Sequence, residues 1–580
     1  MLAALLLFQS FALAATGFAA PTELLKKHST RPLQAESTLQ ALEPWETPIS
    51  GFFIRSHHGV PVVPHNGVDT QWILKIDGLV DHPLTLTLAE LKRLPKKSQK
   101  SLHAVLECSG NGRALQSPVV PGVQWQRGAL GNAEWGGVKL ADLLTQAGVK
   151  ANAHFVRVEG AELPAFSTVP GFIRSVPLGK MLEEDTLLAW TMNREPMPVL
   201  HGGPLRLILT GWYGENWIKW LTHLTLTETE DTGFFMKKGY RVPLKPVKPG
   251  EPWDSSTGAP IEKLLVQSFI GQVRVQKGLK VRVEVDGKAF SGTGHISKVA
   301  LSIDQGETWQ AAEVTRPHQD GSWQEFHKEF HREFHKGLKI PAIRPLIILS
   351  RATDSQGNQQ PLEQNWNPGG YLRNVADSVS VDLEALEALP STRRSVGLEA
   401  KEAKEAKEAK ETSAFKSRFI HNPVLTNRCL SCHTRELIES QRLTRKQWEG
   451  VLKKMEGFGV KLEFEESQSL LGSLQTLSPE LSAVVPSFTR YEAEAGLGAG
   501  RFLSGNATRG AMLFAQNCAV CHGAQSEGRL GPRLRGRLIP VGLFWATVQN
   551  GKGMMPGFGA ILKNQGIADI RTFILPKGDE

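Results

Sequence analysis

The sequence predicts a multidomain protein in which an α+β region is followed by an all-β sandwich and two small all-α modules. Three observations predict this order. The chain has 580 residues, and single hydrophobic cores rarely grow beyond about 250–300 residues. Short strand patterns separated by turns fill the middle of the chain. Two C-x-x-C-H motifs lie beyond them, each next to a helical pattern.

The N-terminal residues 1–20 are apolar and end in small residues, which is typical of an export signal. A single N-terminal membrane anchor is the alternative interpretation. The formal charge of +9 suits an anionic substrate, an anionic cofactor or an acidic electron-transfer partner. The sequence has no nucleic-acid recognition motif and no concentrated basic arm, so nucleic acid is not expected as a partner.

Residues 21–245 make up the α+β region. Their pattern predicts a strand over 72–78 that enters a turn, and an apolar, β-branched run predicts another strand over 205–210. Residues 88–94 predict a short helix between the two strands. A mixed region of this size is typical of one domain.

Residues 258–385 predict a small β-sandwich, because apolar and charged residues alternate, as in 281–285, between turns. A tetrapeptide repeat inside this region places His327, His331 and His335 four residues apart. On a helix these side chains would share one face and form a metal site. The preferred interpretation is an expanded repeat in a surface loop without a metal.

Residues 386–415 form a linker. Within them, 399–410 repeats Glu-Ala-Lys and has no apolar stripe, so this segment is not expected to dock as an amphipathic helix. Such repeats act as semi-rigid helical spacers of roughly 1.5 Å per residue where they are helical. The linker therefore separates the first part of the chain from the two C-x-x-C-H motifs.

Each C-x-x-C-H motif is the signature of covalent c-type haem attachment, with thioether-forming cysteines and a proximal histidine ligand to iron. One motif falls in 416–490 and the other in 491–580. Their residues are Cys429, Cys432, His433, Cys518, Cys521 and His522. The sequence therefore predicts two haem modules.

Each module also offers a downstream methionine as the second axial ligand. In the first module a capping box at 444–447 starts a helix on which Met455 shares a face with Trp448. This segment resembles small cytochromes that accompany sulfite-oxidising enzymes. The second module resembles class I cytochrome c, whose axial methionine precedes a proline, and this implies Met555, with Met554 as the alternative.

The fifth cysteine, Cys108, stands apart from the haem motifs. Since the motifs use the other four cysteines, no disulfide is expected. Cys108 lies in a glycine-containing loop with Glu107 and Arg113 rather than in an apolar run, which argues against a purely packing role. A thiolate is a soft ligand that suits a redox metal.

From about residue 51 to 383 the chain resembles the sulfite oxidase family of molybdenum enzymes. In that family an α+β domain holds one molybdopterin and an immunoglobulin-like dimerisation domain follows it. The family motif C-[AS]-G-N-x-R matches residues 108–113, which implies that Cys108 is the thiolate ligand of molybdenum. The implied catalytic residues are Cys108, Arg55, Arg113, Trp125 and Phe172.

The resemblance also implies a cradle for the pterin and its phosphate. Histidine, arginine and lysine suit an anionic phosphate, which arginine can grip with two hydrogen bonds. The implied cofactor-binding residues are Phe53, His57, Glu162, His201, Arg206, Trp217, Ile218 and Lys219. Ser56 replaces the family's asparagine, and Glu162 replaces its aspartate.

These assignments predict a sulfite dehydrogenase in which the arginines hold sulfite at molybdenum and electrons leave singly through two haems to an external cytochrome c. Two departures concern the substrate pocket. Phe172 lacks the hydroxyl of the family's tyrosine, and Gly369 stands where the family has a third arginine. Arg174 and Arg373 are the candidate replacements.

The departures, with the segment 211–220, leave open a sulfane dehydrogenase that oxidises carrier-bound sulfane sulfur. A third interpretation is an electron-transfer cytochrome with a non-catalytic molybdopterin-like scaffold, against which Cys108, Arg113, His201 and Arg206 argue. The resemblance further implies a homodimer formed through the immunoglobulin-like domain. The export signal and the haem motifs together predict an exported, periplasmic protein.

Overall fold

The computed structural model describes residues 23–477, with gaps at 65, 165–166, 277–279, 316–320, 334–345, 382–394, 397–421 and 431–432, and then 507–522 and scattered positions between 534 and 574. The expected export signal, the Glu-Ala-Lys repeat, His335, Cys432, Met554 and Met555 lie outside the described residues. Among the described helices, none combines the length and apolar character needed to cross a bilayer.

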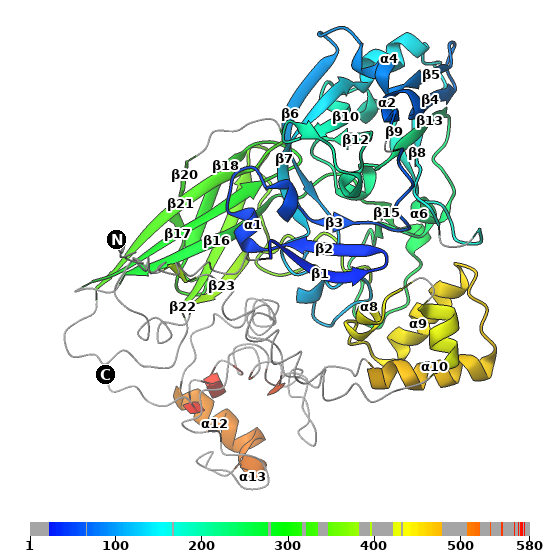
Figure 1. The fold of residues 1–580 in the computed structure, drawn as a ribbon. Coiled ribbons are helices and arrows are strands. Elements are labelled where there is room, and N and C mark those ends of the chain that lie inside the picture. Colours follow the sequence, from blue (N-terminus) through cyan, green and yellow to red (C-terminus); the bar gives the residue numbers. More distant parts are fainter. Residues whose placement is uncertain are drawn as a thin grey trace, which may run out of the picture.

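The α+β domain contains three sheets (Figure 1). The first has the order β1-β2-β3, with bounds Leu25–Thr30, Leu33–Ser37 and Ile54–Arg55. The second has the order β11-β10-β7-β6, with β12 also paired to β10, and its strands are Glu195–Pro196, Thr186–Met192, Leu130–Lys139, Gln99–Glu107 and Arg206–Leu209. The third has the order β5-β4-β13-β8-β9, with bounds Leu84–Thr87, Ile73–Gly78, Leu221–Thr227, Phe155–Gly160 and Ile173–Pro177.

Short helices connect these strands: α1 (Leu39–Leu42), α2 (Val68–Gln71), α3 (Leu88–Lys92), α4 (Leu140–Ala147), α5 (Leu178–Met181) and α6 (Phe234–Lys237). The strand expected over 72–78 is confirmed as β4, the helix expected over 88–94 as α3, and the strand expected over 205–210 as β12. α3 starts at a capping box in which Thr87 and Glu90 bond each other's backbone.

The β-sandwich follows, with two sheets facing each other across an apolar core (Figure 1). One sheet has the order β20-β21-β17-β16-β24, with bounds Glu313–Val314, Gln324–Glu333, Lys280–Phe290, Gln267–Gln276 and Ser395–Val396. The other has the order β19-β18-β22-β23, with bounds Gln310–Ala311, Ile296–Ser302, Leu346–Asp354 and Asp377–Val381. A short ribbon of β14 and β15, Arg241–Val242 and Ala259–Pro260, joins the sandwich to the first domain. The expected sandwich is therefore confirmed.

The histidine repeat does not form the surface loop that the sequence analysis expected. His327 and His331 belong to β21, which pairs along its length with β17. Phe326 and Phe330 alternate with them and are buried in the sandwich core. The four-residue repeat also satisfies the two-residue period of a strand, so its phenylalanines point inward and pairing with β17 decides the structure.

The first C-x-x-C-H motif belongs to a helical module of α8 (Arg435–Glu439), α9 (Arg445–Glu456) and α10 (Phe464–Leu477), preceded by a π-helical turn at Leu425–Cys429. The expected capping box is confirmed between Thr444 and Gln447. Trp448 and Leu452 are buried in the core of this module. In the second module the structure describes α12 (Ala507–Asn517) and α13 (Ala519–His522), together with a cluster of buried apolar residues around Phe514.

Candidate molybdopterin and substrate site

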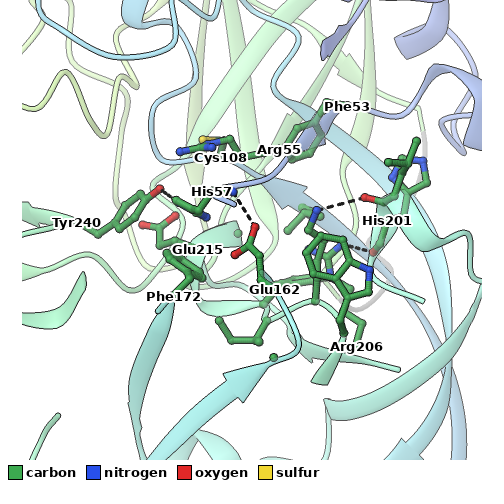
Figure 2. A pocket seen from close by; sticks show the side chains of 18 residues that line it. Phe53, Arg55, His57, Cys108, Glu162, Phe172, His201, Arg206, Glu215 and Tyr240 are labelled. Carbon is green, nitrogen blue, oxygen red and sulfur yellow. Dashed lines mark hydrogen bonds between the residues drawn. The ribbon is translucent and has the colours of Figure 1, made fainter. Parts of the chain in front are cut away.

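A cavity with about 680 Å³ of empty space, its open mouth included, lies in the α+β domain (Figure 2). Five parts of the chain supply its walls: the segment around β3, the end of β6, the segment from the end of β8 to Phe172, residues 200–220, and Tyr240 between α6 and β14. Most of the expected site residues line it, namely Phe53, Arg55, His57, Cys108, Glu162, Phe172, His201, Arg206, Trp217, Ile218 and Lys219.

Cys108 follows directly after β6, where the strand reaches the cavity. Its backbone N–H donates to the Ala129 carbonyl at 2.9 Å, which fixes the start of the loop. Burial raises the pKa of the Cys108 thiol, and the positive charges of Arg55 and Arg113 oppose that rise. The thiol therefore lies in a buried and electropositive place, as a thiolate that binds a metal requires.

Three basic side chains form the other end of the cavity. Arg206 begins β12 and donates from Nη1 to the His201 carbonyl at 2.6 Å. Lys219 donates from Nζ to the Ser56 hydroxyl at 2.8 Å. Burial lowers the pKa of Arg206 to about 9, of Lys219 to about 7 and of His201 to about 3. This cluster of His201, Arg206 and Lys219 is called the inner cation cluster below.

Glu162 fixes the loop between the two ends. Its carboxylate accepts hydrogen bonds from the backbone N–H groups of His57 at 2.7 Å and His58 at 2.9 Å. Figure 2 shows this carboxylate pointing into the centre of the cavity, toward His57. Glu162 thus holds the segment that carries Arg55 and His57. The sequence analysis expected this residue to contact the pterin, whereas here its carboxylate fixes the backbone of the loop.

The hydroxyl missing at Phe172 is present nearby. The Phe172 ring stacks on the His57 ring, with 3.7 Å between centroids. His57 Nε2 in turn shares a hydrogen bond with the Tyr240 hydroxyl, which lines the same cavity. Sequence analysis missed Tyr240 because no local motif marks it. The structure brings it to the site through β14 and the turn after α6.

Arg113 and Trp125 are not among the residues that line the cavity. Arg113 donates to the carbonyls of Val123 at 3.0 Å and Gly369 at 3.2 Å, and its guanidinium lies 5.1 Å from the centre of the Tyr371 ring. Trp125 is fully buried. Both expected residues therefore sit beside the cavity and support its wall in this structure.

Two buried carboxyl groups close to Cys108 were also missed. Glu215 lines the cavity, and burial raises the pKa of its carboxyl to about 7. Burial raises the pKa of Glu107 to about 8, against hydrogen bonds from Asn111 and Gln267. Glu107 is adjacent to Cys108 in the sequence, so its burial could have been suspected. Glu215 had no such signal.

The helical module that carries the first C-x-x-C-H motif packs against this domain, beside β1 and α6 (Figure 1). The hydroxyls of Ser29 and Thr434 lie 3.2 Å apart, and the rings of Phe234 and Phe458 lie 4.6 Å apart between centroids. Burial lowers the pKa of His433, and the charge of Arg55 lowers it further. The charge of Arg55, which lines the cavity, thus reaches His433 of the first C-x-x-C-H motif.

The structure describes only some of the remaining residues that were expected to bind haem. Cys429 is half-buried, and Met455 lies on the same side of α9 as Trp448 and is half-buried. In the second motif Cys518 and His522 are buried, on α12–α13. Cys521 lies in α13, but its side chain is outside the described part of the structure.

Comparisons with known proteins agree with this geometry. Residues 57–235 match the oxidoreductase molybdopterin binding domain, and residues 259–384 match the Mo-co oxidoreductase dimerisation domain. Residues 505–574 match the family of cytochrome C oxidase, cbb3-type, subunit III. The sulfite oxidase of Arabidopsis thaliana is 32% identical over 368 residues, which cover 60% of this chain and 91% of that protein. The chain belongs to the sulfite oxidase family.

The share of the relative's length that this chain matches differs between the proteins compared. The mitochondrial sulfite oxidase of Drosophila melanogaster is 34% identical over 380 residues, and the match spans 62% of this chain but only 63% of that enzyme. Among solved structures, the sulfane dehydrogenase SoxCD from Paracoccus pantotrophus superposes with a TM-score of 0.52 at 25% sequence identity. That superposition covers 65% of this chain and 93% of the SoxCD chain.

The residues of this sulfite oxidase family member fit the family's molybdopterin. Arg206 is buried, and its Nε has no hydrogen-bond partner within the described part of the chain. Burial of the charged forms of Arg206 and Lys219 is costly, and an anionic phosphate beside them would offset that cost. Cys108 offers a soft ligand on the opposite side of the same cavity. The inner cation cluster would hold the phosphate, and Cys108 would hold the metal.

Proposed function

We propose that this protein is a sulfite dehydrogenase: sulfite takes one oxygen atom from water and yields sulfate, two protons and two electrons. The observation that carries the proposal is the position of Arg55. It lines the cavity of Cys108, and its charge also reaches His433, the proximal histidine of the first haem motif. A cavity lined by an arginine that suits an oxyanion and the first C-x-x-C-H motif thus belong to two parts of the chain that pack together, with Thr434, next to His433, in contact with Ser29.

Molybdopterin, when bound, supplies the two-electron redox centre. The protein's own contribution is position and charge. Arg55, which lines the cavity, attracts and orients the dianion, since arginine pairs with oxyanions through charge-assisted hydrogen bonds. Arg113 adds its positive charge from beside the cavity. The hydrogen bond between His57 and Tyr240 fixes the ring that faces the cavity. Phe172 and Phe235 pack around this ring and keep that side of the pocket apolar.

We further propose that both C-x-x-C-H motifs carry haem and that the electrons pass singly through them to an external cytochrome c. His433 and His522 would be the proximal ligands, with Met455 and Met555 opposite them. The two motifs in the sequence and the match of residues 505–574 to a cytochrome family support this. Because c-type haem is attached outside the bacterial cytoplasm, the same motifs support a periplasmic location. The match to a dimerisation domain supports a homodimer formed through the β-sandwich.

Sulfane dehydrogenase is the second candidate. The superposition on SoxCD favours it, because that match covers 93% of the neighbour's chain. Gly369 also favours it, since no side chain extends from this position toward Arg113. A non-catalytic scaffold is the third candidate, and the number of expected cofactor residues that line the cavity argues against it.

One experiment separates the three. The purified full chain is analysed for molybdenum and then mixed, with its haem oxidised, with sulfite or with a peptide persulfide. The proposal expects molybdenum in the protein, haem reduction by sulfite and one sulfate for every two electrons delivered. Reduction by the persulfide alone would establish the second candidate. Absence of molybdenum and of reduction by either donor would establish the third.

A further inference from the structure

Backbone from three separate loops encloses the guanidinium of Arg113. Its Nη1 donates to the Val123 carbonyl at 3.0 Å, and its Nε donates to the Gly369 carbonyl at 3.2 Å. A Cβ built on Gly110 would collide with Nη1 and Nη2, and one built on Gly122 would lie 3.1 Å from the guanidinium carbon. Gly122 also has φ +125°, a conformation that favours glycine. Arg113 therefore joins three loops at one side chain.

The first of these loops carries Cys108. The Asn111 N–H donates to the Cys108 carbonyl at 2.8 Å, and the Arg113 N–H donates to the Gly110 carbonyl at 3.1 Å, so the chain turns tightly between the thiol and the arginine. Because the guanidinium folds back onto Gly110, the arginine side chain covers the backbone two residues beyond the thiol. If the guanidinium moved away, this loop would lose its cover.

Neither arginine that was suggested as a replacement at Gly369 is among the residues that line the cavity. Arg174 is buried and donates from Nε to the side-chain oxygen of Asn216 at 3.1 Å. Arg373 packs against the loop that carries the thiol, since a Cβ built on Gly112 would lie 2.5 Å from its Cδ. The turn that contains Arg373 thus holds this loop from a second side.

The helical module with the first C-x-x-C-H motif binds the loop that contains Gly122. The Gly122 N–H donates to Oε1 of Gln441 at 3.0 Å. Gln441 is buried, and its Nε2 donates to the Leu437 carbonyl at 2.9 Å, so both ends of its amide are bonded. Farther along the same loop, Gln447 donates from Nε2 to the Val119 carbonyl at 2.7 Å. The loop therefore lies between the helical module and the enclosed guanidinium.

Of these two glutamines, Gln441 acts closer to Arg113. The N–H that it binds belongs to Gly122, whose neighbour in the chain supplies the carbonyl that accepts from the guanidinium. Gln447 in addition accepts from the Thr444 N–H in the capping box of α9, so its replacement would also weaken that helix. Gln441 lies between α8 and α9, outside both helices. Its replacement therefore tests the contact with the loop more cleanly.

We propose that Gln441 is a positioning residue through which the helical module holds the loop of Cys108 in place. Gln441 fixes Gly122, the adjacent carbonyl fixes Arg113, and the guanidinium covers the loop of the thiol. The module thus carries the first C-x-x-C-H motif and also keeps Cys108 in position. The inference rests on the proposed function only for the role of Cys108 as the ligand of molybdenum.

The test is the rate at which the Cys108 thiol is alkylated in the cofactor-free full chain, followed by mass spectrometry of the peptide that contains it. The thiol is buried, so alkylation reports opening of its loop. Gln441→Leu leaves the Gly122 N–H unpaired and should raise the rate about fivefold or more. Gln441→Glu keeps an acceptor oxygen and should stay close to the wild type. Lys446→Gln, at an exposed position of α9, is the matched control and should leave the rate unchanged.

Steady-state kinetics of the molybdenum-loaded full chain give a second measure. Gln441→Leu should lower kcat for sulfite by about the factor by which it raises alkylation of the thiol, with little change in KM. The reason is that Arg55, which lines the cavity, belongs to β3 and not to the loop that the module holds. Gln441→Glu should restore kcat.

A wild-type rate of Cys108 alkylation in Gln441→Leu would overturn the inference while leaving sulfite oxidation intact. Equal increases in Gln441→Leu and Gln441→Glu would also overturn it, because the acceptor oxygen would then not be what holds the loop. If instead sulfite fails to reduce haem in the wild type but the alkylation rates follow the expected order, the positioning role stands and the proposed function falls.

Discussion

Two clusters of cations flank Cys108, and they are built in different ways. The inner cation cluster comes from one short stretch, 201–219, around β12. The cations on the substrate side, Arg55 and Arg113, come from two separate parts of the chain, and their charges act together on Cys108 only in the folded protein. The first cluster belongs to one compact stretch, whereas Arg113 is held by the Gly369 carbonyl of the β-sandwich region. The substrate side therefore depends on packing between parts of the chain that are far apart in sequence.

The largest effect on the reaction with sulfite should come from replacing Cys108, which lies between the two cation clusters. Replacing Cys108→Ser removes the soft ligand, and haem reduction by sulfite should fall by more than about 100-fold, since loss of mere supporting contacts at metal sites already costs about 10–100-fold. The measurement is the rate of haem reduction after mixing with sulfite. Ser109→Ala, the neighbouring substitution, should keep at least a tenth or so of the rate. A Cys108→Ser protein that is reduced normally would remove Cys108 from the mechanism.

Removing a cation from the inner cluster should separate cofactor binding from folding. Arg206→Met should reduce the molybdenum content of the purified protein by about tenfold or more. Its cofactor-free form should be no less stable, because replacing a buried charge with an apolar side chain is often neutral or stabilising. Metal analysis and thermal unfolding measure the two effects. Arg93→Met, at an exposed helix end, is the matched control. Full molybdenum content in Arg206→Met would show that Arg206 is not needed to hold the cofactor, and would contradict the role given to the inner cation cluster.

The inner cluster should also give the cofactor-free protein a pH-dependent stability. Lys219 has a folded-state pKa of about 7, below its ordinary value of 10.5. Between these values the unfolded chain holds the proton and the folded protein does not. The free energy of unfolding should therefore rise with pH from about 7 to about 10, by up to about 1.4 kcal/mol per pH unit.

Subtracting the unfolding curve of Lys219→Met isolates this contribution. With the cofactor bound, its phosphate should pair with Lys219 and raise the pKa of the ammonium, so the difference should become independent of pH in this range. If the difference in unfolding free energy does not change with pH in the cofactor-free protein, the fold does not lower the pKa of Lys219. The measurement is denaturant unfolding of both proteins at pH 7 and pH 9, with and without cofactor.

The smallest expected effect concerns the packing of the first helical module against the α+β domain. Phe458→Ala removes one aromatic pair with Phe234, which is worth about 1 kcal/mol, so the module should undock about threefold to fivefold more often. The measurement is the rate of limited proteolysis of the module. Phe464→Ala, at a position that is 78% exposed in the same module, should leave that rate unchanged. Equal rates in Phe458→Ala and the wild type would mean that this ring contact does not hold the module in place.

Sequence alone predicted the inner cluster because His201, Arg206 and Lys219 lie in short motifs whose residues stay together in the fold. It also predicted Cys108 and the two haem motifs, since their chemistry depends on residue type and close spacing. The sandwich was predictable from the alternation of apolar and charged residues. The histidine repeat was expected in a surface loop but lies in β21, because a period of four also satisfies the two-residue period of a strand. Local patterns thus identified the parts.

What sequence could not predict are contacts between parts. Tyr240 reaches His57 from a segment far along the chain and brings a hydroxyl to the ring on which Phe172 stacks. Arg113 is held by the Gly369 carbonyl of a later domain. Such pairings depend on tertiary packing, which leaves no periodic signal in a single sequence.

The most direct test of the account is a single-turnover titration. One equivalent of sulfite is added without oxygen to the oxidised, molybdenum-loaded full chain, and haem absorbance is followed. The account predicts that two electron equivalents appear on haem and that one equivalent of sulfate forms. Sulfate without haem reduction, or no reaction while a persulfide donor reduces the haem, would contradict it.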